Sequence, residues 1–165
     1  MKLTRKQVKS IIKAIRQNKG MAVYPHGLAI VQWYGAAHLV WGNSYSAASW
    51  ELSDSCLPLV GHVVSVEDLE AWYNGSNNTE RFADAQVGFY ASLPVDRVQD
   101  IAFLFRGDLM APVERVAIDS TSLWLLEEMA GGYVQMRFRG SSTAPIDLVN
   151  DSGFRGVLLP VRLEM

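Results

Sequence analysis

The order of secondary structure elements is expected to be the same at the two ends of this chain. Apolar residues spaced three and four apart predict a helix at each end, and short apolar runs bounded by glycine, proline and asparagine predict strands after it. The expected helices cover residues 4–18 and 120–129, and the expected strands cover 21–24, 28–34, 38–41, 46–52, 116–118, 133–139, 144–149 and 154–163. This pattern predicts an α+β fold in which a helix plus an antiparallel β-meander is used at both ends of the chain.

The first helix has a well-defined start and two different sides. Thr4 and Gln7 fit a capping box, in which the side chain of each residue bonds the backbone N–H of the other. Val8, Ile11 and Ile15 follow at helical spacing and give the helix an apolar side. The cations of the helix lie outside that apolar side: Arg5, Lys6, Lys9, Lys13 and Arg16.

The charge of the chain is unevenly distributed, although its net value is only −2. Residues 1–19 contain seven lysines and arginines and no acid, whereas the rest of the chain contains all 17 acids and eight arginines. Cations directed at phosphates give sequence-independent nucleic-acid binding, so the helix residues above are candidate DNA contacts. Two alternatives remain open: an anionic membrane surface, for which the apolar side lacks Trp and Phe, and a solvated face without a partner.

A length of 165 residues favours one domain. We therefore expect a single domain over 1–165, in which 61–112 is a divergent insertion or a connecting segment. Ser65 is expected to cap a helix over 66–73, residues 87–93 are expected to form a strand, and 95–105 fits a helix or a strand. The apolar stretch 21–41 is interrupted by proline and glycine (Pro25, Gly27 and Gly35) and by polar residues (His26, Gln32 and His38), so it does not predict a membrane span. We expect a cytoplasmic protein.

Few residues suggest catalysis. Cys56 and His62 could form a nucleophile and its base, but a lone cysteine is most often a small buried hydrophobe. His26, His38 and His62 lack metal-ligand spacing, and the sequence contains neither a phosphate-binding loop nor a dinucleotide-binding motif. We predict no enzyme activity, no cofactor and no metal.

Aromatic residues cluster between positions 24 and 50. They can stack nucleobases, but core packing or subunit contact is the better prediction for residues on strands. The cluster comprises Tyr24, Trp33, Tyr34, Trp41, Tyr45 and Trp50.

The C-terminal third resembles the end of the bacterial DNA sliding clamp, the beta subunit of the replicative polymerase. The matching pieces are Leu123-Trp-Leu-Leu-Glu-Glu-Met, Tyr133-Val-Gln-Met-Arg-Phe, Thr143-Ala-Pro-Ile-Asp-Leu, Asn150-Asp-Ser-Gly and Val157-Leu-Leu-Pro-Val-Arg-Leu163. The resemblance implies a clamp-like fold, basic helices that face DNA, and a pocket for clamp-binding peptides at Val157, Leu159, Pro160 and Val161. The chain is shorter than clamps of two or three domains, and 61–112 matches no clamp element.

These observations lead to two hypotheses. The first is a sliding-clamp-like processivity factor, a homo-oligomeric ring around duplex DNA that tethers a DNA polymerase or other replication proteins. The second is a small clamp-like adaptor or inhibitor that binds host replication or defence proteins without encircling DNA. A phage or mobile-element protein would fit either hypothesis.

Overall fold

The structure of the protein is a computed structural model, and it describes residues 1–17, 24, 26–43, 45–92 and 116–161. The helices are α1 (Arg5–Gln17), α2 (Val66–Gly75), α3 (Asp84–Tyr90), α4 (Ser120–Ala130) and the 3-10 helix η1 (Asp54–Leu59). The strands are β1 (Lys2–Leu3), β2 (Gly27–Trp33), β3 (Ala36–Gly42), β4 (Ser46–Glu51), β5 (Val63–Ser65), β6 (Phe82–Ala83), β7 (Gln135–Arg137), β8 (Ile146–Val149) and β9 (Phe154–Leu158). The α+β fold expected from the sequence is confirmed.

Two β-meanders meet edge to edge in one antiparallel sheet. Within the described residues this sheet has seven strands in the order β5-β2-β3-β4-β9-β8-β7. The seam lies between β4 and β9, where Trp50 pairs with Phe154 and Ser46 pairs with Leu158. Because β2-β3-β4 on one side mirrors β7-β8-β9 on the other, the two helix-plus-meander units have equivalent places in the sheet.

The turn between β2 and β3 shows why the first meander folds tightly. Tyr34 and Gly35 both have positive φ, 50° and 80°, and they connect the paired residues Trp33 and Ala36. Positive φ at both central residues is typical of the two-residue turn whose twist matches that of paired strands.

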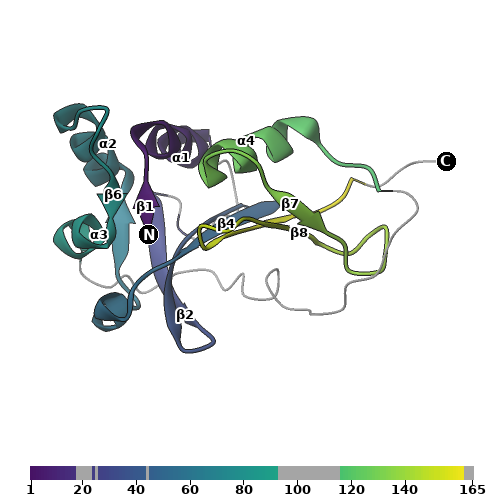
Figure 1. The fold of residues 1–165 in the computed structure, drawn as a ribbon, viewed down its shortest axis with the longest axis horizontal. Coiled ribbons are helices and arrows are strands. Elements are labelled where there is room, and N and C mark those ends of the chain that lie inside the picture. Colours follow the sequence, from purple (N-terminus) through teal and green to yellow (C-terminus); the bar gives the residue numbers. More distant parts are fainter. Residues whose placement is uncertain (18–23, 25, 44, 93–115, 162–165) are drawn as a thin grey trace.

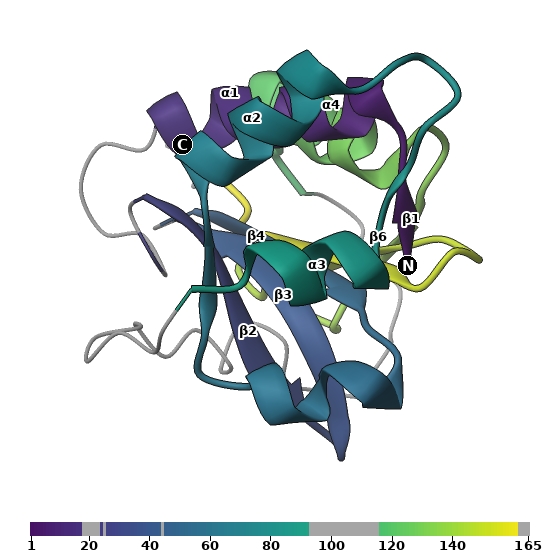
Figure 2. The same ribbon diagram turned by 90° about the vertical axis from the view of Figure 1, so that its left-hand side faces the viewer.

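The helices α1 and α4 cover one face of the sheet, and α2 packs beside α1 (Figures 1 and 2). The main core lies between these helices and the strands, where Trp41, Leu148 and Met129 are almost fully buried. A smaller apolar cluster on the opposite face contains the buried residues Ala29, Val40, Ala47 and Val157.

Asp119 and Gly131 cap the two ends of α4. The side chain of Asp119 accepts hydrogen bonds from the hydroxyl and the backbone N–H of Ser122, at 2.6 and 3.2 Å. The bond from the Ser122 hydroxyl is the largest of the effects that lower the pKa of the Asp119 carboxyl. At the other end, Gly131 adopts the left-handed conformation with φ of 86° and ends the helix.

Residues 61–92 supply an edge strand and two helices. β5 pairs with β2, α2 lies along α1, and β6 pairs with β1 in a separate two-stranded sheet. The strand expected over 87–93 is wrong, because α3 extends over Asp84–Tyr90. The expectations for 95–105 and for the strand at 21–23 lie outside the described residues.

Candidate nucleic-acid interface

The capping box fixes the start of α1. The backbone N–H of Thr4 donates to Gln7 Oε1 at 2.9 Å, and the backbone N–H of Gln7 donates to Thr4 Oγ1 at 3.1 Å. Gln7 Nε2 also donates to the carbonyl of Met129 at 2.9 Å. This buried side chain therefore joins the first turn of α1 to the last turn of α4.

Three lysines of α1 point to solvent. Val8, Ile11 and Ile15 are buried against the core, and Lys6, Lys9 and Lys13 on the other side are exposed. None of the three forms an ion pair with a residue in the described part of the chain. Since an α-helix rises 1.5 Å per residue, these ammonium groups follow about 10 Å of the helix axis. We call Lys6, Lys9 and Lys13 the lysine row.

Arg5 differs from the lysine row, because it bonds to neighbouring protein groups. Its guanidinium donates to Ser76 Oγ at 3.1 Å, to Asn78 Oδ1 at 3.0 Å and to the carbonyl of Tyr73 at 3.1 Å. It also lies 4.2 Å from the centre of the Tyr73 ring. Arg5 thus ties the start of α1 to the end of α2 and to the loop that follows it.

Arg16, at the other end of α1, forms ion pairs with acidic side chains. Its Nη2 lies 2.8 Å from Glu70 Oε1, and its Nη1 lies 3.9 Å from Glu67 Oε1. Both acids belong to α2. Because these carboxylates offset its positive charge, Arg16 should attract a phosphate less strongly than the residues of the lysine row do.

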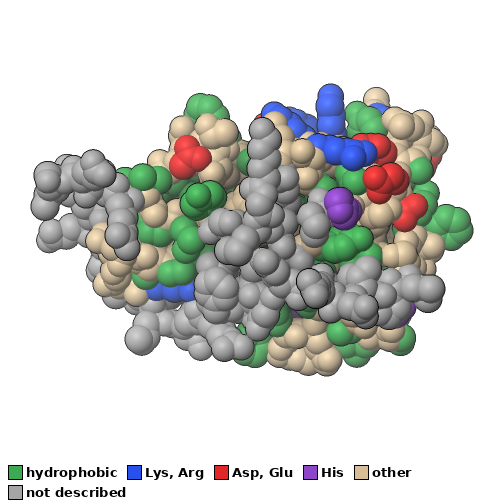
Figure 3. Space-filling model, turned by 180° about the vertical axis from the view of Figure 1, so that it is seen from behind, with side chains coloured by type: hydrophobic (Ala, Val, Ile, Leu, Met, Phe, Trp, Pro, Cys, Tyr) green, Lys and Arg blue, Asp and Glu red, His purple; other side chains and the backbone are tan. Residues whose placement is uncertain are grey.

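Acids lie on both sides of the lysine row. Glu67 and Glu70 project from α2 on one side. On the other side, Glu128 of α4 accepts a hydrogen bond from Ser10 Oγ of α1 at 3.1 Å, and Glu127 precedes it. Figure 3 shows Lys and Arg side chains gathered along the helical side of the molecule with acidic side chains next to them. The positive surface is therefore a narrow row.

A hollow of about 900 Å³ lies between the start of α1 and the end of α4. One wall contains Arg5, Lys6 and Arg81, and the other contains Trp124, Glu127, Glu128 and Tyr133. Trp124 is 62% exposed and Tyr133 is 91% exposed. We call this site the tryptophan hollow.

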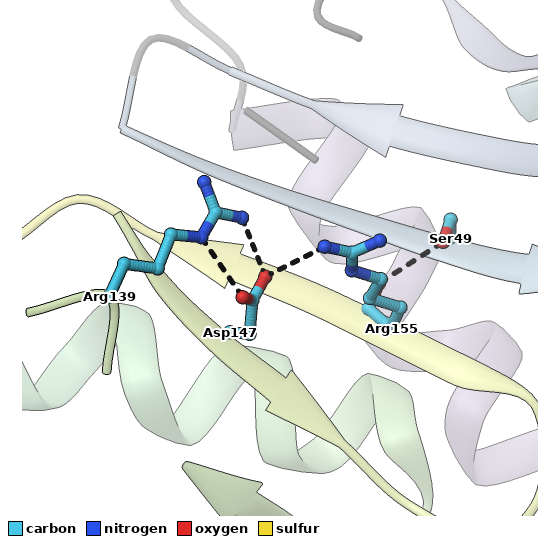
Figure 4. A network of polar contacts seen from close by, with 4 residues as sticks. All are labelled: Ser49, Arg139, Asp147 and Arg155. Atoms are coloured by element: carbon cyan, nitrogen blue, oxygen red, sulfur yellow. Dashed lines mark hydrogen bonds and ion pairs between the residues drawn. The ribbon is translucent and has the colours of Figure 1, made fainter. Parts of the chain in front are cut away.

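A buried polar network lies on the opposite face of the sheet (Figure 4). Arg139 donates two hydrogen bonds to the Asp147 carboxylate, from Nε at 3.0 Å and from Nη2 at 2.7 Å. Arg155 Nη2 donates to the same carboxylate at 3.2 Å. The side chains of Arg139 and Asp147 are each 8% exposed. Ser49 Oγ donates to the carbonyl of Arg155 at 3.2 Å and links the network to β4.

This network borders a second hollow of about 600 Å³. Its lining includes Arg155, Arg137, Trp33 and His38. Burial is the largest influence on His38 and lowers the pKa of its imidazole, against a smaller raising effect of Glu51. Cations and acids occur together in this lining, so charge alone does not favour an anionic ligand.

The four residues of the expected peptide pocket have different environments. Val157 is fully buried in the smaller apolar cluster, with Leu159 packed against it. Pro160 is half-buried, and Val161 is 49% exposed and bonded through its backbone N–H to the carbonyl of Ala117. Neither hollow described above contains any of the four.

Cys56 and His62 are placed poorly for catalysis. Cys56 is 3% exposed and packs in the main core, and the ring of His62 bonds the carbonyl of Leu59 at 3.1 Å. Within the described ranges, no three His, Cys, Asp or Glu side chains gather as metal ligands. No helix in the same ranges is both long and apolar enough to cross a membrane.

The clustered aromatic residues fall into three groups. Trp41 and Trp50 are buried in the main core. Tyr24 and Trp33 are partly buried against the smaller apolar cluster, and Tyr34 and Tyr45 are exposed. The exposed Trp124 was not singled out from the sequence. Its signal was present, because Leu123, Leu126 and Met129 follow the helical spacing and leave Trp124 on the other side of the helix.

No protein-family model matches this sequence, and no curated protein matches it. Among solved structures, the fold is similar to that of DNA polymerase III subunit beta from Borrelia burgdorferi, solved in complex with a natural product. The TM-score is 0.52 and the sequence identity is 10%, and the match covers 99% of this chain and 64% of that chain. This chain therefore spans less than two thirds of that subunit, and it has a sliding-clamp-like fold.

Proposed function

We propose that this protein is a sliding-clamp-like processivity factor of the cytoplasm. Copies of the chain would assemble into a ring around duplex DNA, and the ring would tether a DNA polymerase or another replication protein. The lysine row on α1 is the observation on which the proposal depends, together with the clamp-like fold.

Several features of the helical layer support this assignment. The lysine row is exposed and lacks acidic partners among the described residues, so its ammonium groups are available to phosphates. Contacts of this kind give no sequence information, which suits a protein that has to slide. Arg5 and Arg16, which bond within the protein, are left out of the proposed DNA contacts. Leu159, Pro160 and Val161 remain the proposed surface for clamp-binding peptides.

Solution mass at moderate salt, measured by light scattering, tests the ring. A single oligomer of three or more copies is the expected result, and a monomer at high protein concentration would overturn the proposal. Duplex DNA binding is then compared with that of a Lys6→Gln/Lys9→Gln/Lys13→Gln variant. The variant should keep the oligomer mass and lose duplex binding, because its substitutions lie on the exposed side of α1.

The acids around the lysine row favour a second candidate function. Glu67 and Glu70 on one side and Glu127 and Glu128 on the other leave only a narrow strip of positive charge. A surface of mixed charge suits a protein partner, so the alternative is a clamp-like adaptor or inhibitor that binds replication or defence proteins without encircling DNA. A stable monomer without duplex affinity would favour this alternative.

A further inference from the structure

Trp124 lies on the solvent side of α4. Leu126 and Met129 of the same helix are buried in the core, whereas the Trp124 side chain is 62% exposed. Tyr133, just beyond the end of α4, is 91% exposed and lines the same hollow. Neighbouring exposed aromatic side chains in a hollow mark an interaction site more often than isolated ones do.

The wall that faces Trp124 is basic. Lys6 is exposed and has no acidic partner among the described residues. Arg81 donates only to backbone carbonyls, those of Asn78 at 3.2 Å and Glu80 at 3.1 Å, so its charge is not neutralised by a carboxylate in the described ranges. Both residues border the tryptophan hollow.

The opposite wall is acidic beside its aromatic residues. Glu127 and Glu128 lie next to Trp124 in the lining of the hollow. Carboxylates repel phosphates, and they accept hydrogen bonds from the ring N–H or amino groups on the edges of unpaired bases. A nucleotide in this hollow would therefore have one orientation, with its phosphate toward Lys6 and Arg81 and its base toward Trp124.

We propose that the tryptophan hollow binds unpaired nucleotides of single-stranded nucleic acid. A base stacks on Trp124, and the phosphate backbone follows Lys6 and Arg81. Aromatic platforms beside cations are the usual means of binding single strands without sequence preference. A hollow of about 900 Å³ also lies in the size range of ligand sites, about 300–1,000 Å³.

This inference extends the proposed function and rests on its assumption that the helical layer faces nucleic acid. It adds a preference that the lysine row alone does not provide, because paired bases inside a duplex are not free to stack on a side chain. The protein would hold a single-stranded stretch next to a duplex at the α1–α4 side of the molecule.

The test compares binding of a fluorescein-labelled 12-nucleotide oligo-dT with binding of a labelled duplex, both measured by fluorescence anisotropy. Trp124→Ala should weaken oligo-dT binding about fivefold or more, the range expected for loss of one stacked base, and should change duplex binding less than twofold. Trp124→Phe should retain most of the single-strand affinity. Phe89→Ala is the matched control, because Phe89 is 80% exposed and lies on α3, outside the hollow.

The possible results separate this inference from the proposed function. If the unmodified protein binds duplex DNA and Trp124→Ala binds oligo-dT as well as before, the inference is wrong and the proposed function stands. An equal loss in Trp124→Ala and Phe89→Ala would also overturn it, since binding would then not depend on the hollow. If the unmodified protein binds neither nucleic acid, both are wrong.

Discussion

If the proposed function holds, Lys9→Gln is expected to remove about one third of the salt dependence of duplex DNA binding. The lysine row has three members without acidic partners among the described residues, Lys6, Lys9 and Lys13. Each ammonium that neutralises a phosphate contributes about −0.9 to the slope of log K against log salt concentration. One copy of the chain should therefore give a slope of about −2.7, and the variant about −1.8.

The same slopes predict measurable changes in affinity. Raising the salt from about 50 to 200 mM should weaken binding about 40-fold with three contacts and about 12-fold with two. If several copies in a ring touch the duplex together, both slopes are multiplied by the same number. Their ratio of about two thirds is then unchanged, so the prediction does not depend on the size of the oligomer.

Anisotropy of a labelled duplex, titrated at four or five salt concentrations, measures these slopes. Arg16→Gln is the matched control on the same helix, because Arg16 is already paired with Glu70 at 2.8 Å. Its slope should stay close to that of the unmodified protein. A slope that Lys9→Gln leaves unchanged, or that Arg16→Gln lowers as much, would refute the assignment of the lysine row as the DNA contact.

Three further predictions concern stability. Asp147→Asn should lower the free energy of unfolding in urea by about 3–5 kcal/mol, because it leaves the buried charge of Arg139 without its carboxylate; a loss below about 1 kcal/mol would contradict the role given to this network. Arg5→Ala should cost about 1–3 kcal/mol by the same measurement, since it removes three hydrogen bonds from a charged donor; an unchanged midpoint would show that this tie is dispensable. The pKa of His38 is lowered in the folded protein from its ordinary value of 6.5, so the unfolded chain binds more protons and stability should fall as the pH drops below about 6.5. His38→Gln should make this decline shallower in thermal unfolding at several pH values, and an identical decline would exclude His38 as a cause.

The helices and meanders could be predicted because their signals are local. Thr4 and Gln7 define the start of α1 within four residues, and Asp119 and Gly131 define the two ends of α4. The segment 87–93 was predicted wrongly because Val87, Phe89 and Tyr90 are good strand formers. There Gln86 Oε1 accepts the backbone N–H of Ala83 at 2.9 Å and starts a helix instead.

The candidate site was only partly predictable from the sequence. The cations of α1 were visible, but the partners that occupy Arg5 and Arg16 lie far away in the chain: Ser76 and Asn78 for Arg5, and Glu70 for Arg16. No local pattern shows which cations remain unpaired. The burial of Val157 has the same origin, because it depends on Ala29, Val40 and Ala47 in strands of the other meander.

The seam between β4 and β9 has a consequence for synthesis on the ribosome. Trp50 cannot pair with Phe154 until that residue, about 100 positions later in the chain, has been synthesised. At about 5–20 residues per second, that interval lasts about 5–20 s. During this time β4 is an edge strand without its final neighbour, and such edges tend to pair with other chains. The β4 edge of a nascent chain is therefore open to pairing with other chains until the last strand has left the ribosome.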